Sequence, residues 1–407
     1  MNFLFAWRYF KAKKSTNAIN VIAWISILAI VVGTAALILV LSVFNGFEDL
    51  VKSLYSSFYP DMKVIPASGK QLTLTQEQIN KLRSVKGVHA VSLVVEEKAM
   101  LINGDYQANA YMKGVDEQYT KVAGVKEHLI KGNFDLGDSL NPKLILGAGI
   151  ENAIGVQSDR SLEPVLIYTG RKGDIDLNNP LNNVSSAEAF PAGAFIIQQD
   201  FDNKYALTHI SFLKMMLEMQ PDTYSAAEIS LPENTDPGEV QEALQRLLGK
   251  NYLVQNRFEQ NRSLYAVMRA EKWVIYAILS LILVVAAFNM VGALTMLVLE
   301  KKEDINVLHA LGADRSLIQK IFLSEGLLLA LIGGAAGMVI AYTLAILQIN
   351  FKLIPLQGGT FLIDYFPVKL NPADFILVTA TIIIIAVVAS YFPARKAAMQ
   401  QFIIREE

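Results

Sequence analysis

Four long apolar runs constrain this chain more than any other feature of its 407 residues. One run lies near the start, at Ile19–Phe44, and three lie near the end, at Trp273–Leu299, Ile318–Leu347 and Ala373–Phe392. Each run is about as long as the roughly 20 residues that an α-helix needs to cross a bilayer. The sequence between the first two runs has the mixed composition of a soluble domain. The pattern therefore predicts an α-helical membrane protein with four transmembrane helices and a large α+β domain inserted between helices 1 and 2.

Composition agrees with this class of protein. Apolar residues make up 53% of the chain and charged residues 18%, whereas average soluble domains are roughly 25% charged. The formal net charge of −2 offers no basic surplus for a nucleic-acid partner. The chain has no cysteine, which excludes a disulfide framework, a thiolate metal site and a cysteine nucleophile.

The basic residues that flank the apolar runs predict an orientation. They gather before the first run, between the second and third runs and after the fourth, at Arg8, Lys11, Lys13, Lys14, Lys301, Lys302, Arg315, Lys320, Arg395, Lys396 and Arg405. By the positive-inside rule, both termini are cytoplasmic and the large domain lies outside. A secretory signal peptide is the rival interpretation of the first run, but that run is too long and no small-residue cleavage site follows it.

These considerations predict a segment for every part of the chain. The segments are a cytoplasmic amphipathic segment (1–18), helix 1 (19–44), the outside domain (45–272), helix 2 (273–299), a cytoplasmic coupling helix (300–317), helix 3 (318–347), an outside loop (348–372), helix 4 (373–392) and a cytoplasmic tail (393–407). Within the outside domain we expect a core of about 60–117 and 221–257 and an insert of about 118–220. The first segment is either an interfacial helix on anionic lipid or a simple extension of helix 1.

Local signals inside the outside domain predict particular helices and strands. A capping box of Thr75 and Gln78 begins a helix over Thr75–Arg83. Asp236 is placed to cap a second helix that starts with Pro237. Strands are expected at Val88–Val95 and Lys98–Ile102, followed by a tight turn at Asn103-Gly104-Asp105.

The loop between the second and third runs contains a short amphipathic pattern. Glu303 and Asp304 begin it, where the helix dipole favours acidic residues, and Gly312 ends it. The apolar residues of this helix are Ile305, Val307, Leu308 and Leu311. Such a helix suits docking into the groove of another protein. An ordinary solvated helix is the alternative.

The same loop begins a resemblance to a known family. The motif is EKKEDINVLHALGADRSLIQKIF, followed by the small residues Gly333–Gly337, and it resembles the macrolide-efflux and cell-division superfamily of ABC-transporter permeases. Lipoprotein-releasing (Lol-type) permeases resemble the chain in ISILAIVVGTAALILVLSVFNGFED, KLILGAGIENAIGV and YFPARKAA. The resemblance covers nearly the whole chain in order. It departs most at Ser158-Asp159 and in the polar stretch Thr169–Pro191.

The resemblance implies a permease of the bacterial inner membrane with a periplasmic domain and no cofactor of its own. Two permease chains, identical or siblings, would work with a dimer of separate ATPase chains to lift an acylated lipoprotein from the membrane lipid. Exposing acyl chains to water costs about 0.8 kcal/mol per CH₂. We therefore expect lipoprotein-binding residues at the outer ends of helices 1 and 2, namely Val43, Phe44, Phe47, Leu264, Tyr265 and Met268. Ordinary interfacial packing is the alternative.

The polar stretch Thr169–Pro191 lies where that family has a periplasmic arm that recruits a lipoprotein chaperone. Its most apolar part, Leu177, Pro180 and Leu181, is the expected tip of the chaperone-binding arm. A solvated loop is the alternative, because long loops in compact domains are either functional or disordered.

Catalytic motifs are missing from the sequence. No phosphate-binding loop occurs, since Leu248-Gly249-Lys250-Asn251 lacks its first glycine and its hydroxyl, and no Gly-x-Ser-x-Gly elbow occurs. The histidines are scattered without metal-ligand spacing. We expect a transport subunit whose ATP is hydrolysed by a partner chain, with Glu325 and Asn289 as polar residues inside the spans.

Three other classes of protein remain to be weighed. A macrolide-efflux-type exporter shares the architecture but normally carries its ATPase domain on the same chain. A cell-division-type membrane regulator has a much smaller outside domain. A membrane hydrolase needs a catalytic constellation that the sequence does not contain.

Overall fold

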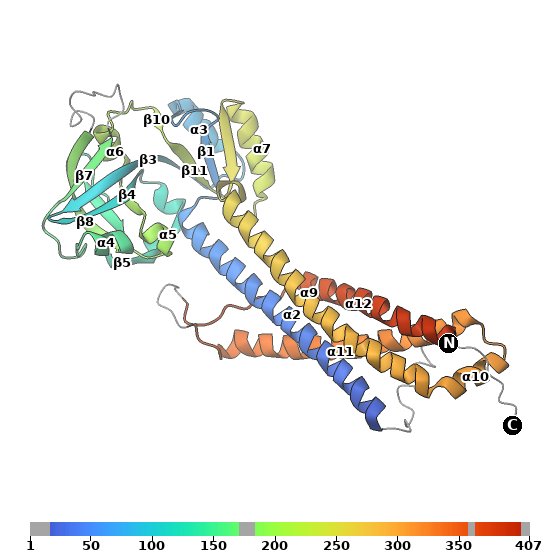
Figure 1. Ribbon diagram of the computed structural model, residues 1–407. Coiled ribbons are helices and arrows are strands. Elements are labelled where there is room, and N and C mark those ends of the chain that lie inside the picture. The colour runs from blue at the N-terminus through green and yellow to red at the C-terminus, as the bar shows by residue number, and fades with distance from the viewer. Residues whose placement is uncertain (1–16, 171–183, 357–362, 400–407) are drawn as a thin grey trace, which may run out of the picture. The chain divides into compact units, whose positions relative to one another are not determined.

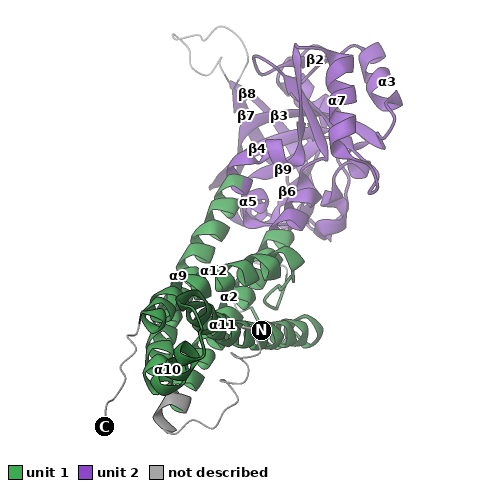
Figure 2. Cartoon of the chain, turned by 90° about the vertical axis from the view of Figure 1, so that its right-hand side faces the viewer, with its two compact units in different colours: residues 1–50, 266–357, 363–407 green, residues 51–265, 358–362 purple. Residues whose placement is uncertain are grey.

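The structure, a computed structural model, describes residues 17–170, 184–356 and 363–399. The chain forms two compact units (Figure 2). Unit 1 comprises residues 1–50, 266–357 and 363–407, and unit 2 comprises residues 51–265 and 358–362. The amphipathic segment predicted at 1–18 lies almost wholly outside the described residues.

Unit 1 is built from long helices that pack side by side (Figure 1). Their bounds are α2 Asn17–Phe58, α9 Arg262–Glu300, α11 Arg315–Phe351 and α12 Pro372–Ala398, with the short α10 Lys302–Ala310 between α9 and α11. The last turns of α2 and the first turn of α9 belong to unit 2. Within the described part of the chain, α2, α9, α11 and α12 are long and apolar enough to cross a membrane.

Each long helix extends beyond the apolar run that predicted it. A charged residue ends an apolar run without ending a helix, whereas capping side chains fix the true ends. Asp314 accepts a hydrogen bond from the backbone N–H of Leu317 at the start of α11. Asn371 does the same for Ala373 at the start of α12. The helices therefore begin at these caps rather than where the hydrophobicity begins.

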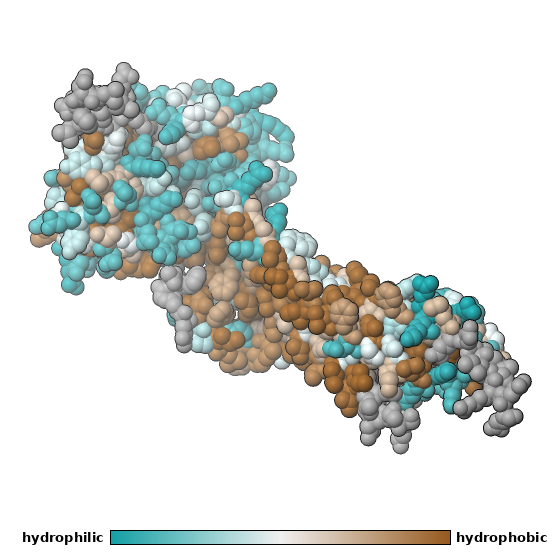
Figure 3. All heavy atoms as spheres, viewed as in Figure 1, coloured by the Kyte–Doolittle hydropathy of each residue, from teal (hydrophilic) through white to brown (hydrophobic). Residues whose placement is uncertain are grey.

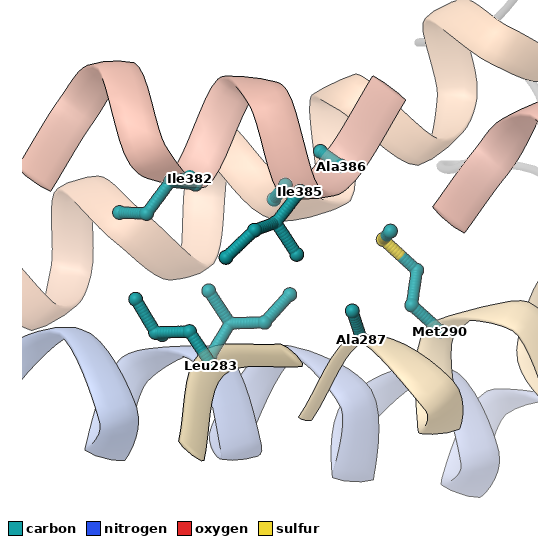
Figure 4. A pocket seen from close by; sticks show the side chains of 8 residues that line it. Leu283, Ala287, Met290, Ile382, Ile385 and Ala386 are labelled. Carbon is teal, nitrogen blue, oxygen red and sulfur yellow. The ribbon is translucent and has the colours of Figure 1, made fainter. Parts of the chain in front are cut away.

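The interior of unit 1 is close-packed and apolar. The predicted small-residue pair on α11 lies against α2, where a Cβ on Gly337 would come within 2.6 Å of the Val31 carbonyl oxygen. Between α9 and α12, Figure 4 shows a narrow apolar space lined by Leu283, Ala287, Met290, Ile382, Ile385 and Ala386, together with Ile30 and Ala330. The face of the long helices that Figure 3 shows is also largely hydrophobic, as contact with a bilayer requires.

Unit 2 is an α+β unit around one mixed sheet. The strands are β1 Met62–Pro66, β2 Leu72–Thr73, β3 Ala90–Asn103, β4 Tyr106–Val115, β5 Leu129–Gly132, β6 Lys143–Gly147, β7 Val165–Gly170, β8 Val184–Phe195, β9 Tyr205–His209, β10 Thr223–Tyr224, β11 Ala226–Ser230 and β12 Tyr252–Asn256. The helices are α3 Gln76–Ser84, η1 Tyr119–Lys121, η2 Gly124–His128, α4 Ala148–Ala153, α5 Gln199–Asp202, α6 Ile210–Met216, α7 Pro237–Leu248 and α8 Arg257–Gln260. The sheet order is β12-β1-β11-β3-β4-β9-β6-β8-β5, and β7 pairs with both β3 and β8.

Two hydrophobic clusters support this sheet. One packs α3 and α7 against the strands around β1, through residues such as Ile79, Leu82 and Leu244. The other packs α4 and α6 against the strands around β6, through residues such as Ile150 and Phe212. Strands from the expected core and from the expected insert share one sheet, joined where β4 and β9 pair in parallel and where β3 and β7 pair antiparallel.

Local signals placed several elements of unit 2 correctly. The capping box at Thr75 and Gln78 is present, and Asp236 caps α7 with Pro237 in its first turn. Gly104 has a φ of +57° in the turn between β3 and β4, a conformation that glycine adopts without strain.

Two predictions for unit 2 were wrong. The strands expected at Val88–Val95 and Lys98–Ile102 are one strand, β3, because its backbone pairs with β4 without a break from Val94 to Asn103. The ends of the polar stretch Thr169–Pro191 are not loop, because β7 and β8 pair with each other up to Gly170 and Val184. Backbone pairing therefore outweighs the polar composition there.

Candidate functional site

The short helix α10 carries the predicted ATPase-coupling residues, which the structure divides into two groups. Ile305 is only 1% exposed and belongs to the core of unit 1, and Leu308 is half-buried. Val307 and Leu311 are 58% and 79% exposed. Ile305 therefore holds the helix to the bundle, whereas Val307 and Leu311 present apolar surface. Ile305 thus lies apart from the exposed coupling residues, and the role of α10 in coupling stays a prediction.

The two acidic residues of α10 stabilise its start. Glu303 and Asp304 lie in the first turn, where they oppose the positive end of the helix dipole. Asp304 also pairs with Lys301 at 3.0 Å. Gly312 follows the helix with a φ of +90°, as expected for a residue that ends it. These caps fix α10 so that Val307 and Leu311 keep a defined position.

The residues predicted to bind lipoprotein fall in both units. Val43, Phe44 and Phe47 on α2 and Met268 on α9 are half-buried residues of unit 1. The ring of Phe47 meets that of Phe366 edge-on, with centroids 5.9 Å apart. Leu264 and Tyr265 are half-buried residues of unit 2. The ring centroids of Tyr265 and Phe258 are 4.8 Å apart.

Sequence reasoning missed a polar network at this end of unit 1. Lys272 on α9 donates a hydrogen bond to Asn45 Oδ1 on α2 over 2.7 Å, and its ammonium lies 3.3 Å from Asp374 on α12. Asn45 in turn donates to Asp374 over 2.6 Å. The available signal was Asp374, an ionisable residue inside the fourth apolar run, since such residues are functional candidates by default.

The polar residues that were singled out inside the spans lie elsewhere. Glu325 is buried on α11. Asn289 is exposed on α9, on the surface of unit 1. The predicted chaperone-binding residues Leu177, Pro180 and Leu181 lie outside the described residues. In the described part of the chain, no group of three or more His, Cys, Asp or Glu residues is placed to hold a metal ion.

Comparison with known proteins identifies the class. Residues 23–247 match the MacB-like periplasmic core domain, and residues 276–402 match the FtsX-like permease C-terminal domain. The chain is 27% identical to the lipoprotein-releasing system transmembrane protein LolC of Neisseria meningitidis serogroup B, over 97% of both chains. It is 25% identical to LolE of Haemophilus influenzae, over 98% of this chain and 97% of that one.

A fused relative is also similar. The macrolide export ATP-binding/permease protein MacB of Vibrio parahaemolyticus is 24% identical over 92% of this chain but only 56% of its own length. The apolar helices, the two matched domains and these relatives thus define an ABC-transporter permease, a multi-pass protein of the bacterial inner membrane. The chain belongs to the MacB-like periplasmic core domain family, and within that superfamily it is a Lol-type permease.

Proposed function

We propose that this permease releases acylated lipoproteins from the inner membrane and passes them to a soluble periplasmic chaperone. The observation that carries the proposal is the similarity to LolC and LolE over nearly the whole of each chain. That similarity covers the sequences of both units, so it is not confined to one domain. The fused exporter MacB is matched over little more than half its length.

The proposed topology follows from charge. Both termini and α10 lie in the cytoplasm, because basic residues concentrate before α2, around α10 and after α12. Unit 2 then lies in the periplasm, between the first and second membrane helices. In this orientation the polar network of Asn45, Lys272 and Asp374 is at the outer end of the bundle.

The proposed coupling contact is made by α10. Val307 and Leu311 insert into a groove of a separate ATPase chain, with Glu303 and Asp304 beside them and Leu308 in support. Their exposure favours this role, because exposed apolar residues on a capped cytoplasmic helix gain free energy when a partner covers them. Movement of the ATPase is thereby transmitted to α9 and α11, which flank α10 in the chain.

The proposed substrate contact is made at the outer ends of the first two membrane helices. Val43, Phe44 and Phe47 on α2 and Leu264, Tyr265 and Met268 on α9 receive the acyl chains. Burial there offsets the cost of about 0.8 kcal/mol for each CH₂ that would otherwise meet water. All six side chains are half-buried, so each retains surface for a ligand.

The proposed chaperone contact is made by residues 171–183, with Leu177, Pro180 and Leu181 at its centre. Support comes from the residues that flank this segment. Gly170 and Val184 pair across the ends of β7 and β8. The segment therefore connects two paired strands, and replacing it with a Gly-Ser linker should leave the sheet intact.

A photo-crosslinking experiment tests the proposed function. The chain is reconstituted with its ATPase and any sibling permease, and a photoreactive residue replaces Phe47 or Met268. Capture of an acylated lipoprotein before ATP is added, and its transfer to the soluble chaperone afterwards, are the expected results. Equal capture of a non-acylated form would contradict acyl-chain binding at these residues. Release of a macrolide instead of lipoprotein would favour the exporter.

A further inference from the structure

Three helices of unit 1 are joined by one hydrogen-bonded unit that uses every polar group of Asn45. Its carbonyl oxygen accepts from Lys272, and its amide nitrogen donates to Asp374 and, at 3.4 Å, to the backbone carbonyl of Lys369. Asn45 and Asp374 are each 6% exposed, and the Lys272 side chain is 27% exposed. A buried polar group is costly unless it is paired, so this fully satisfied arrangement strongly favours a single geometry.

The network contains one positive and one negative charge, which balance each other. The Lys272 ammonium and the Asp374 carboxylate neutralise each other at 3.3 Å, and Asn45 bridges them from the third helix. Asp374 also lies in the first turn of α12, where the helix dipole favours a negative charge. Loss of the Lys272 charge would leave the Asp374 carboxylate buried and unpaired, which is the costly way to break a buried ion pair.

The segment that leads into α12 also contacts α2, on both sides of Asn45. The backbone N–H of Lys369 donates to the Ser42 carbonyl over 2.9 Å, and the Lys369 side chain pairs with Asp49. The chain crosses α2 at Gly46, where a Cβ would come within 2.3 Å of the Pro367 carbonyl oxygen. Asn45 on α2 is therefore held both by Lys272 and Asp374 and by the segment that precedes α12.

We propose that Asn45, Lys272 and Asp374 form a polar clasp that fixes the distance between α2 and α9 at the acyl-chain site. The three are positioning residues. Phe44 is the direct neighbour of Asn45, and Met268 precedes Lys272 by four residues and so shares its face of α9. A change in the clasp thus moves the side chains that are proposed to meet the acyl chains. This role rests on the proposed function, whereas the clasp itself does not.

Distance measurements between spin labels test the clasp directly, and the absence of cysteine from the sequence makes labelling specific. Cysteines replace the exposed residues Val40 on α2 and Arg269 on α9 in the full chain, reconstituted in lipid nanodiscs. A control pair at Met296 on α9 and Phe392 on α12 reports on the rest of the bundle. The variants are Lys272→Met, Asp374→Asn and the conservative Lys272→Arg.

If the clasp exists, the distribution of distances between the Val40 and Arg269 labels should be broader in Lys272→Met and in Asp374→Asn than in the wild type. The distance distribution of the control pair should not change. Lys272→Arg should keep the narrow distribution, because its guanidinium also pairs with a carboxylate. The proposal is overturned if the Met and Asn variants leave the distribution unchanged, if both label pairs broaden together, or if Lys272→Arg is as broad as Lys272→Met.

A second measurement separates the clasp from the proposed function. In the complex with the ATPase, stimulation of ATP hydrolysis by acylated lipoprotein should fall in the variants whose Val40–Arg269 distance broadens. Stimulation that persists in those variants would overturn the positioning role. If lipoprotein fails to stimulate even the wild-type complex, the proposed function fails, while the distance measurements still decide whether the clasp exists.

Discussion

The ammonium group of Lys113 on β4 lies 2.8 Å from one carboxylate oxygen of Glu228 on β11 and 3.1 Å from the other. Both side chains are only 1% exposed. The rings of Phe58 and Tyr119 each lie 4.8 Å from the ammonium. Burial by itself would lower the pKa of Lys113, but Glu228 and the other negative groups around it raise that pKa well above its usual value. Lys113 therefore keeps its charge inside unit 2.

Removing one partner of this pair should be strongly destabilising. Lys113→Met removes the closer of the two cations beside the buried Glu228 carboxylate and leaves only Lys63, 4.0 Å away. Breaking a buried pair in this way typically costs about 3–5 kcal/mol. The double variant Lys113→Met, Glu228→Leu should cost clearly less, because the Glu228 carboxylate is removed together with its cation and Glu96 keeps Lys63 as a partner at 3.7 Å. Hydrogen exchange of the β4 and β11 amides in the full chain measures both effects.

The matched control is Lys81→Met. Lys81 pairs with Glu77 at 2.7 Å on the surface of α3, where both side chains are more than half exposed. Exposed pairs of this kind contribute about 0–1 kcal/mol. If Lys81→Met and Lys113→Met reduced the hydrogen-exchange protection of the β4 and β11 amides equally, the special role of the buried pair would be contradicted.

Glu96 predicts how the stability of unit 2 depends on pH. Burial opposes its charge, but Lys63 and Lys113 outweigh burial and hold the pKa of Glu96 below its usual value of 4.5. Its contribution to stability is thus complete above pH 4.5 and is lost as the pH falls through the lowered pKa. Thermal unfolding of unit 2 within the full chain should reflect this loss. Glu96→Gln should show a weaker decline over the same range, and identical declines in the two proteins would contradict the assignment.

Sequence-based prediction succeeded where short-range chemistry decides the structure. The Thr75 capping box, the Asp236 cap and the Gly104 turn each depend on a few neighbouring residues. The apolar runs placed the long helices because bilayer thickness sets a simple length requirement. The helices extend beyond these runs, because caps such as Asp314, and not hydrophobicity, determine where a helix begins.

Contacts between distant parts of the chain could not be predicted in the same way. Asn45 and Asp374 are separated by 329 positions, and neither has a local motif that indicates its partner. The amphipathic period of α10 was correct, but the period does not say which apolar residues face the bundle. That Ile305 points inward and Leu311 outward depends on how α10 packs on its own unit.

Gly46 should tolerate no side chain. An alanine Cβ would lie 2.3 Å from the Pro367 carbonyl oxygen, so the chain that crosses α2 must shift. Overpacking of this kind costs about 1–3 kcal/mol, which exceeds the gain in helix propensity of up to about 1 kcal/mol. The expected result for Gly46→Ala is a lower midpoint of thermal unfolding in detergent.

Gly292 on α9 is the matched control for Gly46. Apart from its chain neighbours and the nearby backbone of α9 itself, no heavy atom of the described structure lies within 4 Å of the position that its Cβ would occupy. Gly292→Ala should therefore leave stability unchanged or raise it by up to about 1 kcal/mol. If the two alanine variants unfold at the same temperature, the close crossing at Gly46 does not limit stability.

The exposed residues of α10 should determine coupling to the ATPase. Val307→Asp or Leu311→Asp places a charge where the proposed groove is apolar, while Ile305 continues to hold α10 to the bundle. Loss of a central contact residue typically costs 2 kcal/mol or more of binding free energy, and about 1.4 kcal/mol already weakens binding tenfold. We therefore expect the ATPase to bind at least about tenfold more weakly to either variant, while the membrane helices still insert.

Leu140→Asp is the control, because Leu140 is 87% exposed in unit 2 and takes no part in the proposed contact. Affinity is measured by titrating the purified ATPase onto each variant in nanodiscs, and wild-type affinity in both α10 variants would rule out docking through this surface.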